Sequence, residues 1–207
     1  MHPNPVFHTQ TEARNLAFAA QAGVGTLAVS GADGMPLMAH VPFVIEDGRV
    51  LFHLVRSNPI ARALGDGLPG KIFVQGPGSY ISPDWYGLED QVPTWNYVAV
   101  HLAGPVQRLA QDRLRDVLDR LSLRFEEQLL PKPIWTAEKV SDEQMARLMR
   151  MIVPCCLNIA DVQGTWKLAQ NKPDFARLAV ADVVAEHGIG MELAALADLM
   201  RAPPGSE

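Results

Sequence analysis

The chain has 207 residues, of which 48% are hydrophobic and 20% are charged, a balance typical of a folded globular protein. Its formal net charge is −5, and no cluster of lysine and arginine stands out. This charge argues against direct binding of nucleic acid, because proteins that grip nucleic acid carry a basic surface. No apolar run could span a bilayer and the N-terminus lacks a secretory signal, so we expect a cytoplasmic protein with no membrane partner.

The first quarter of the chain predicts a helix followed by antiparallel strands. Thr9 or Thr11 can cap the helix, and Gly23 ends it. Alternating or β-branched segments separated by turn-forming residues then predict strands at 24–30, 38–45 and 49–55.

A short helix is predicted over 57–64, where Ser57 or Asn58 serves as cap and Pro59 fits the first helical position. A strand is predicted over 71–75. The stretch that follows is rich in glycine, proline and aromatic residues and predicts turns, before a long strand over 95–109.

The pattern then changes to a helical period over 111–130 and again over 141–152. Strand character returns over 155–164, and the tail over 174–202 is helical with a break near Gly188. The order of elements predicts an α+β fold with a closed or half-open antiparallel barrel.

Three histidines lie in predicted strands. Alternation places His40 and His101 opposite the apolar faces of their strands, whereas His53 shares a face with Leu51 and Val55. Surface or interface histidines with ordinary hydrogen bonds are the alternative interpretation. The spacing fits no local ligand pattern, so we expect no metal site.

The segment from His53 to Arg62 ends a strand and opens a helix, whose first amides can bind phosphate. Arg56, Ser57 and Asn58 add donors there, and Lys71 begins the next strand. The alternative is a capped helix with solvated arginines.

Aromatic residues gather between positions 80 and 97 among glycines and prolines: Tyr80, Trp85, Tyr86, Trp95 and Tyr97. They could cover a planar ligand or fill a small core under a loop. The polar run KLAQN over 167–171 follows the late strand, and Lys167 is its only ionisable residue.

No motif for a nucleophile, a nucleotide loop or a protease metal pair occurs in the sequence, so no catalytic residue is assigned. Cys155 and Cys156 are adjacent in an apolar strand, which favours packing over a disulfide or a reactive thiol. Any chemistry would then depend on a cofactor.

Four strings occur in an order that resembles one family: AHVPF (39–43), GPGSYISPDWY (76–86), VPTWNYVAVHLAG (92–104) and KLAQN (167–171). The sequence resembles the PaiB-like family of FMN-binding negative transcriptional regulators. The last string departs from the family pattern, because Ala169 replaces a serine.

The resemblance implies the split barrel of pyridoxamine 5′-phosphate oxidases and flavin reductases, as one domain over 1–207 with helical additions at 111–152 and 174–202. It further implies a homodimer that holds FMN between its subunits. The phosphate would lie near His53, Arg56, Ser57 and Asn58, with Lys71 close by. His40 would lie near the flavin ring. The remaining residues implied at the site are Trp95, Asn96, Tyr97, His101, Lys167, Gln170 and Asn171.

Two kinds of function follow from this resemblance. The first is negative regulation of transcription by a flavin-bound homodimer; the family name implies DNA as a partner, but the acidic charge argues against direct contact. The second is an FMN-dependent oxidoreductase, with Lys167 or His101 as a donor near the flavin N1/O2 edge. A haem-binding or cofactor-free split barrel is a further alternative.

Overall fold

A computed structural model of the chain describes residues 1–204. The chain divides into two compact units. The first unit comprises Met1–Phe18, Val74–His101 and the chain from Gln163 onward, and the second comprises Ala19–Phe73 and Leu102–Val162. Each unit is described by itself.

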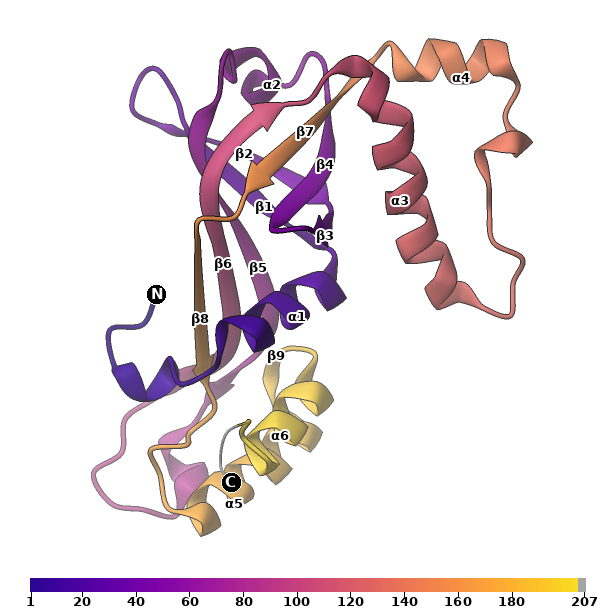
Figure 1. Ribbon diagram of the computed structural model, residues 1–207. Helices are drawn as coiled ribbons and strands as arrows, with labels where there is room; N and C mark the ends of the chain where they lie inside the picture. Colours follow the sequence, from indigo (N-terminus) through magenta and orange to yellow (C-terminus); the bar gives the residue numbers. More distant parts are fainter. Residues whose placement is uncertain (205–207) are drawn as a thin grey trace. The chain divides into compact units, whose positions relative to one another are not determined.

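The described residues form helices and strands in alternating groups (Figure 1). The α-helices are α1 (Glu12–Ala22), α2 (Pro59–Ala63), α3 (Leu114–Glu126), α4 (Asp142–Met149), α5 (Asp174–His187) and α6 (Leu193–Arg201). The strands are β1 (Val24–Ser30), β2 (Pro36–Pro42), β3 (Val44–Glu46), β4 (Arg49–Val55), β5 (Leu68–Ile81), β6 (Thr94–Arg108), β7 (Ile152–Asn158), β8 (Asp161–Lys167) and β9 (Ile189–Met191).

The strands follow the order β2-β1-β5-β6-β7-β4-β3, and β8 pairs with β6 while β9 pairs with β5. In the second unit, β1 pairs antiparallel with β2 and with β5, in a register that places Leu27 opposite Ala39 and Ile72. Leu27 and Ile72 are fully buried, so this face of the sheet forms the core of the second unit. The predicted α+β class with an antiparallel split barrel is confirmed.

Local signals account for several boundaries. Gly23 follows α1 with φ +64°, a conformation that glycine adopts without strain. Asn58 caps α2 by accepting a hydrogen bond from Ile60 N at 2.8 Å, and Pro59 occupies the first turn. These predicted helix ends are confirmed.

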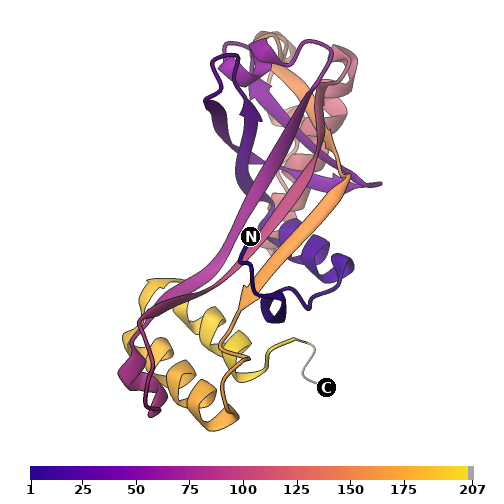
Figure 2. The same cartoon turned by 90° about the vertical axis from the view of Figure 1, so that its left-hand side faces the viewer.

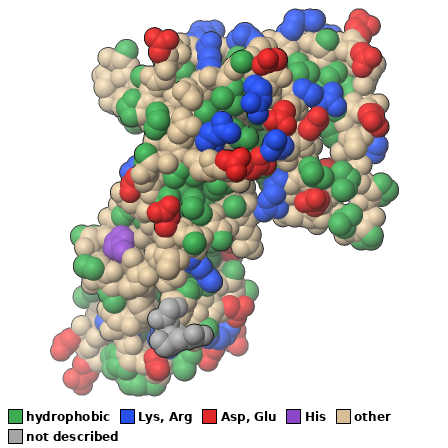
Figure 3. All heavy atoms as spheres, in the orientation of Figure 1, with side chains coloured by type: hydrophobic (Ala, Val, Ile, Leu, Met, Phe, Trp, Pro, Cys, Tyr) green, Lys and Arg blue, Asp and Glu red, His purple; other side chains and the backbone are tan. Residues whose placement is uncertain are grey.

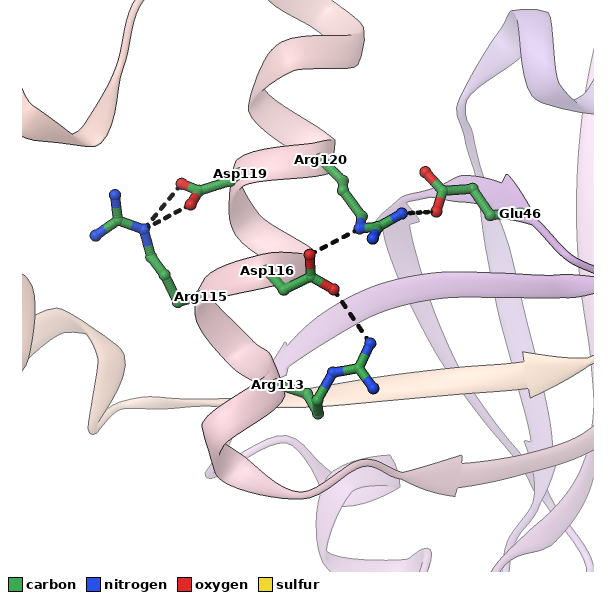
Figure 4. Close-up of polar contacts among 6 residues, drawn as sticks. All are labelled: Glu46, Arg113, Arg115, Asp116, Asp119 and Arg120. Atoms are coloured by element: carbon green, nitrogen blue, oxygen red, sulfur yellow. Dashed lines mark hydrogen bonds and ion pairs between the residues drawn. The ribbon is translucent and has the colours of Figure 1, made fainter.

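Helix α3 covers the sheet of the second unit through Val117 and Leu121, which pack against Leu51 and Cys156. Its solvent side carries a chain of ion pairs (Figure 4). Arg120 joins Glu46 at the end of β3 to Asp116 on α3, and Arg113 contacts the same Asp116. These exposed pairs add little stability individually, but they connect α3 to β3.

In the first unit, α5 and α6 lie side by side (Figure 2). They bury one face of the strands around Val98 and Trp166. Trp166 Nε1 donates to Asn15 Oδ1 on α1 at 2.8 Å, and both side chains are almost completely buried.

Three sequence-based predictions are corrected by the structure. The strand expected over 38–45 is two strands, because Phe43 N bonds Gly23 O at 2.7 Å and both Phe43 and Val44 are buried, which interrupts the alternation. Residues 76–81, predicted as turns, continue β5. The strand expected over 155–164 is divided between β7 and β8.

Candidate functional site

The second unit presents an outward sheet face formed by β1, β2 and β5. The side chains that alternate with the buried Leu27 and Val29 belong to Thr26 and Ala28. Thr26 lies opposite His40 on β2 and Phe73 on β5. Because strands pair in register, these side chains lie on the same face.

This outward face carries a lysine whose charge is not compensated. Lys71 lies opposite Ala28, and its side chain is half-buried. Within residues 1–204 the side chain of Lys71 forms no ion pair or hydrogen bond. A half-buried ammonium without a counter-ion favours an anionic ligand.

His40 is exposed and its Nδ1 is 3.0 Å from Thr26 Oγ1. This hydrogen bond orients the imidazole and leaves its Nε2 at the exposed edge of the ring. Thr26 was not predicted as a site residue, although the alternation of 24–30 would have placed it on this face.

His53 lies near the end of β4, opposite Pro154 on β7. Its Nδ1 is buried and has no hydrogen-bond partner within the described part of the chain. Burial lowers the pKa of His53, because the low-dielectric surroundings penalise the imidazolium. An unpaired buried nitrogen close to the start of α2 is a position where a bound polar ligand would supply the missing contact.

Arg56 and Ser57 form the turn between β4 and α2 with Asn58. The Arg56 side chain is already engaged: Nε donates to Arg150 O at 3.1 Å, and Nη2 donates to Ile152 O at 3.3 Å. Nη2 also donates to Gln111 Oε1 at 3.1 Å. Arg56 therefore has a structural role in joining this turn to the end of α4 and the start of β7.

In the first unit, Trp95 is 45% exposed and lies close to the backbone of Gly78, where an added Cβ would be 2.9 Å from Trp95 Nε1. Asn96 is 1% exposed, and its Nδ2 contacts Met200 Sδ at 3.7 Å. Tyr97 and His101 are half-buried and alternate with the buried residues of β6.

Lys167 ends β8 and its Nζ donates to Thr94 Oγ1. The same Nζ lies 5.8 Å from the centre of the Phe7 ring. Burial lowers the pKa of Lys167, and the charge of Lys172 lowers it further. Thr94 was not predicted, although it stands in the same PTWNY string as Trp95.

The turn after Lys167 is closed by Gln170. Its Oε1 accepts from Leu168 N at 2.8 Å, and its Nε2 donates to Trp166 O at 2.6 Å and Val6 O at 3.2 Å. Gln170 thus holds the turn in shape, whereas Asn171 is exposed. Ala169, which replaces the serine of the family pattern, adopts φ +60° in this turn.

The structure brings the predicted residues together in two groups. His40 and Lys71 share the outward face of the second unit. His53 lies near the end of β4, and Arg56, Ser57 and Asn58 follow in the turn to α2. Trp95, Asn96, Tyr97, His101, Lys167, Gln170 and Asn171 belong to the first unit.

Three further features of residues 1–204 concern metal ligands, cysteine thiols and helix length. No group of three or more His, Cys, Asp or Glu side chains is arranged to hold a metal ion. Cys155 and Cys156 are buried free thiols, as expected, and burial raises the pKa of Cys155 to about 12. No described helix is long and apolar enough to cross a membrane.

Residues 1–161 match the family model described as "Putative FMN-binding domain". The chain is 31% identical over 159 residues to the protease synthase and sporulation protein PAI 2 of Bacillus subtilis, covering 75% of each chain. Two solved structures have a similar fold. One is the FAD and heme binding protein from Mycobacterium smegmatis, with a TM-score of 0.58, 19% identity and coverage of 89% of this chain and 82% of that chain. The other is the conserved hypothetical protein Rv2991 from Mycobacterium tuberculosis, with a TM-score of 0.59, 15% identity and coverage of 83% and 94%.

Proposed function

Because the chain belongs to the FMN-binding domain family and its cofactor is FMN, we propose that it works as a homodimer with FMN on the outward face of β1, β2 and β5. The observation that carries this proposal is the uncompensated Lys71 on a face whose other side chains, including Thr26, His40 and Phe73, bear no formal negative charge. FMN combines an anionic phosphate with a flat ring system, and this face offers a partner to each.

The fit can be stated residue by residue. Ala28 and Phe73 supply apolar surface for a flat ring. Thr26 and His40 supply polar groups at the edge of that surface, already oriented by their mutual hydrogen bond. Lys71 supplies a positive charge for the phosphate.

The turn from His53 to Asn58 is the second part of the proposed site. Ser57 is exposed and can donate its hydroxyl to a phosphate oxygen. His53 has an unpaired Nδ1 that a ligand could satisfy. Asn58 and Arg56 support the site mainly by holding the turn, since Asn58 Oδ1 and two Arg56 nitrogens already bond the protein.

The homodimer is proposed because this face is left uncovered. Val24 is 50% exposed and Met38 is 64% exposed on the same face. A second copy would bury these side chains and enclose the flavin. The free, buried Cys155 and Cys156 favour the cytoplasm as the location of this dimer.

FMN, when bound, supplies electron transfer through its ring system. For the biological role we propose negative regulation of gene expression, as the family resemblance implies, through a route in which the protein does not contact DNA. The net charge of −5 supports an indirect route. On the side of the molecule drawn in Figure 3, basic and acidic side chains are interspersed. The Bacillus subtilis relative is named a protease synthase and sporulation protein, and its link to sporulation is compatible with a regulatory role.

A second candidate is an FMN-dependent oxidoreductase. It is favoured by Lys167, because an amine whose pKa is lowered by burial can exchange a proton more readily at neutral pH. Anaerobic mixing of the FMN-loaded protein with NADH or NADPH tests it: bleaching of the flavin band supports the reductase, and no bleaching at saturating donor contradicts it.

Absorbance and sedimentation test the main proposal. After incubation with FMN and desalting, the protein should retain one flavin per chain and sediment as a dimer. A colourless monomer would refute the proposed site and assembly together. Gel-shift assays with operator-length DNA over a salt series should show no sequence-specific complex; a tight specific shift would contradict the indirect route.

A further inference from the structure

A cavity of about 260 Å³ lies between α3 and α4 in the second unit, well separated along the chain from the proposed flavin face. We call it the α3–α4 cavity. Its lining includes Arg115, Leu118, Asp119, Trp135, Ala137 and Met145. None of these residues belongs to the outward face of β1, β2 and β5.

The walls of the α3–α4 cavity are almost entirely apolar. Leu118 comes from α3, Trp135 from the segment after it, and Met145 from α4. Helix α4 buries no residue, and its Leu148 is 44% exposed. An eight-residue helix gains most of its stability from a buried apolar face, so this face favours an occupant that completes its packing.

The polar groups at the cavity lie on α3. Arg115 Nε donates to both carboxylate oxygens of Asp119, at 2.9 and 2.8 Å. The two terminal nitrogens of Arg115 point away from Asp119 (Figure 4), and within residues 1–204 they form no other hydrogen bond. A guanidinium with unused donors is suited to a carboxylate, which it can bind through two parallel bonds.

Size limits the occupant. An apolar cavity of roughly 150 Å³ accommodates benzene, and pockets for larger ligands usually measure about 300–1,000 Å³. The α3–α4 cavity lies between these sizes, and its methionines can adapt to the shape of a guest. Trp135 offers an aromatic surface for a flat guest.

We propose that the α3–α4 cavity binds a small aromatic carboxylate of one or two rings, with the ring against Trp135 and Met145 and the carboxylate at Arg115. The site is separate from the proposed flavin face on the same chain. An occupant would pack against the apolar side chains of α4, whose C-cap carbonyl, Arg150 O, accepts from Arg56 Nε at 3.1 Å.

Calorimetric titration with naphthalene-2-carboxylate tests the proposal, with 2-naphthol as the uncharged comparison. Saturable binding of one molecule per chain is expected, and 2-naphthol should bind about ten-fold more weakly, since it lacks the charged group. The affinity should be the same with and without FMN. Competition by FMN, or no saturable heat up to about 1 mM ligand, would overturn the proposal.

Two matched variants locate the binding. Ala137→Leu fills the cavity, whereas Ala146→Leu adds the same atoms to an exposed position of α4 that does not line it. Ala137→Leu should weaken binding by about ten-fold or more and Ala146→Leu by less than about two-fold. Equal affinities in the two variants would place the ligand elsewhere and refute the site.

A third variant keeps the test decisive if Ala137→Leu does not fold. Met145→Ala widens the cavity, so anthracene-2-carboxylate should gain affinity relative to naphthalene-2-carboxylate. An unchanged ratio would contradict binding in the cavity. If no carboxylate binds to the parent protein or to any of these variants, the small-molecule proposal is wrong.

Discussion

Replacement of Lys71 by methionine tests the proposed FMN site most directly. Methionine keeps the length and apolar stem of the side chain but removes its charge. The side chain of Lys71 has no hydrogen bond or ion pair within residues 1–204, so the substitution removes no polar contact of the protein. Arg56 is a poorer choice, because its loss would also remove hydrogen bonds to the carbonyls of Arg150 and Ile152.

The size of the expected effect follows from the bond that Lys71 would form. A hydrogen bond between a charged amine and a phosphate contributes about 1.5–3 kcal/mol. This corresponds to a dissociation constant for FMN that is about 10- to 150-fold higher in Lys71→Met. The midpoint of thermal unfolding of the apoprotein should stay unchanged, since the lysine has no partner to lose.

Quenching of flavin fluorescence measures both affinities, and riboflavin provides the internal control because it lacks the phosphate. Lys71→Met should weaken FMN binding and leave riboflavin binding unchanged. Lys139→Met, at an exposed position near α4, is the matched control and should affect neither ligand. Equal weakening of both flavins would place Lys71 away from the phosphate, and no weakening would refute its role in the site.

Three further predictions concern stability. Burial lowers the pKa of His53 below its ordinary 6.5, so the unfolded chain takes up a proton at this residue before the folded chain does as the pH falls. The free energy of unfolding should therefore decline below about pH 6.5. His53→Gln should reduce that decline, measured by urea titrations at two pH values. Asn15→Ala removes the acceptor of the buried Trp166 Nε1 and should cost about 1–3 kcal/mol in urea unfolding. Gly104→Ala would place a Cβ 1.8 Å from Asn158 O, and the backbone shift should lower stability by about 1–3 kcal/mol.

Each of these predictions has a result that contradicts it. An unaltered pH profile in His53→Gln would mean that another group controls acid unfolding. An Asn15→Ala midpoint equal to that of the parent would show that water replaces the lost acceptor. Normal stability of Gly104→Ala would show that β6 and the end of β7 can move apart at this point without cost.

The sequence alone determined features that depend on neighbouring residues. The capping of α2 by Asn58, the end of α1 at Gly23 and the alternation along β1 and β6 all follow from local backbone geometry and side-chain spacing. The family resemblance was equally readable, because its strings are contiguous. The α+β class needed only the order of these elements.

The tertiary structure decided whatever depends on contacts between distant segments. Gly76 and Gly78 were predicted to form turns, yet they lie within β5. Glycine is used there because close side chains leave no room for a Cβ: one added at Gly76 would lie 2.5 Å from Phe18 Cζ, and one at Gly78 2.9 Å from Trp95 Nε1. No local pattern distinguishes this use of glycine from a turn.

The same reason applies to the candidate site. The sequence predicted Arg56 as a phosphate ligand. In the structure, two of its nitrogens donate to backbone carbonyls about a hundred residues away along the chain. The sequence placed Lys71 only close to the phosphate. In the structure, strand pairing leaves Lys71 on an uncovered face without a counter-ion. Residue type and spacing identify which side chains can bind a ligand, whereas long-range packing decides which of them remain free to do so.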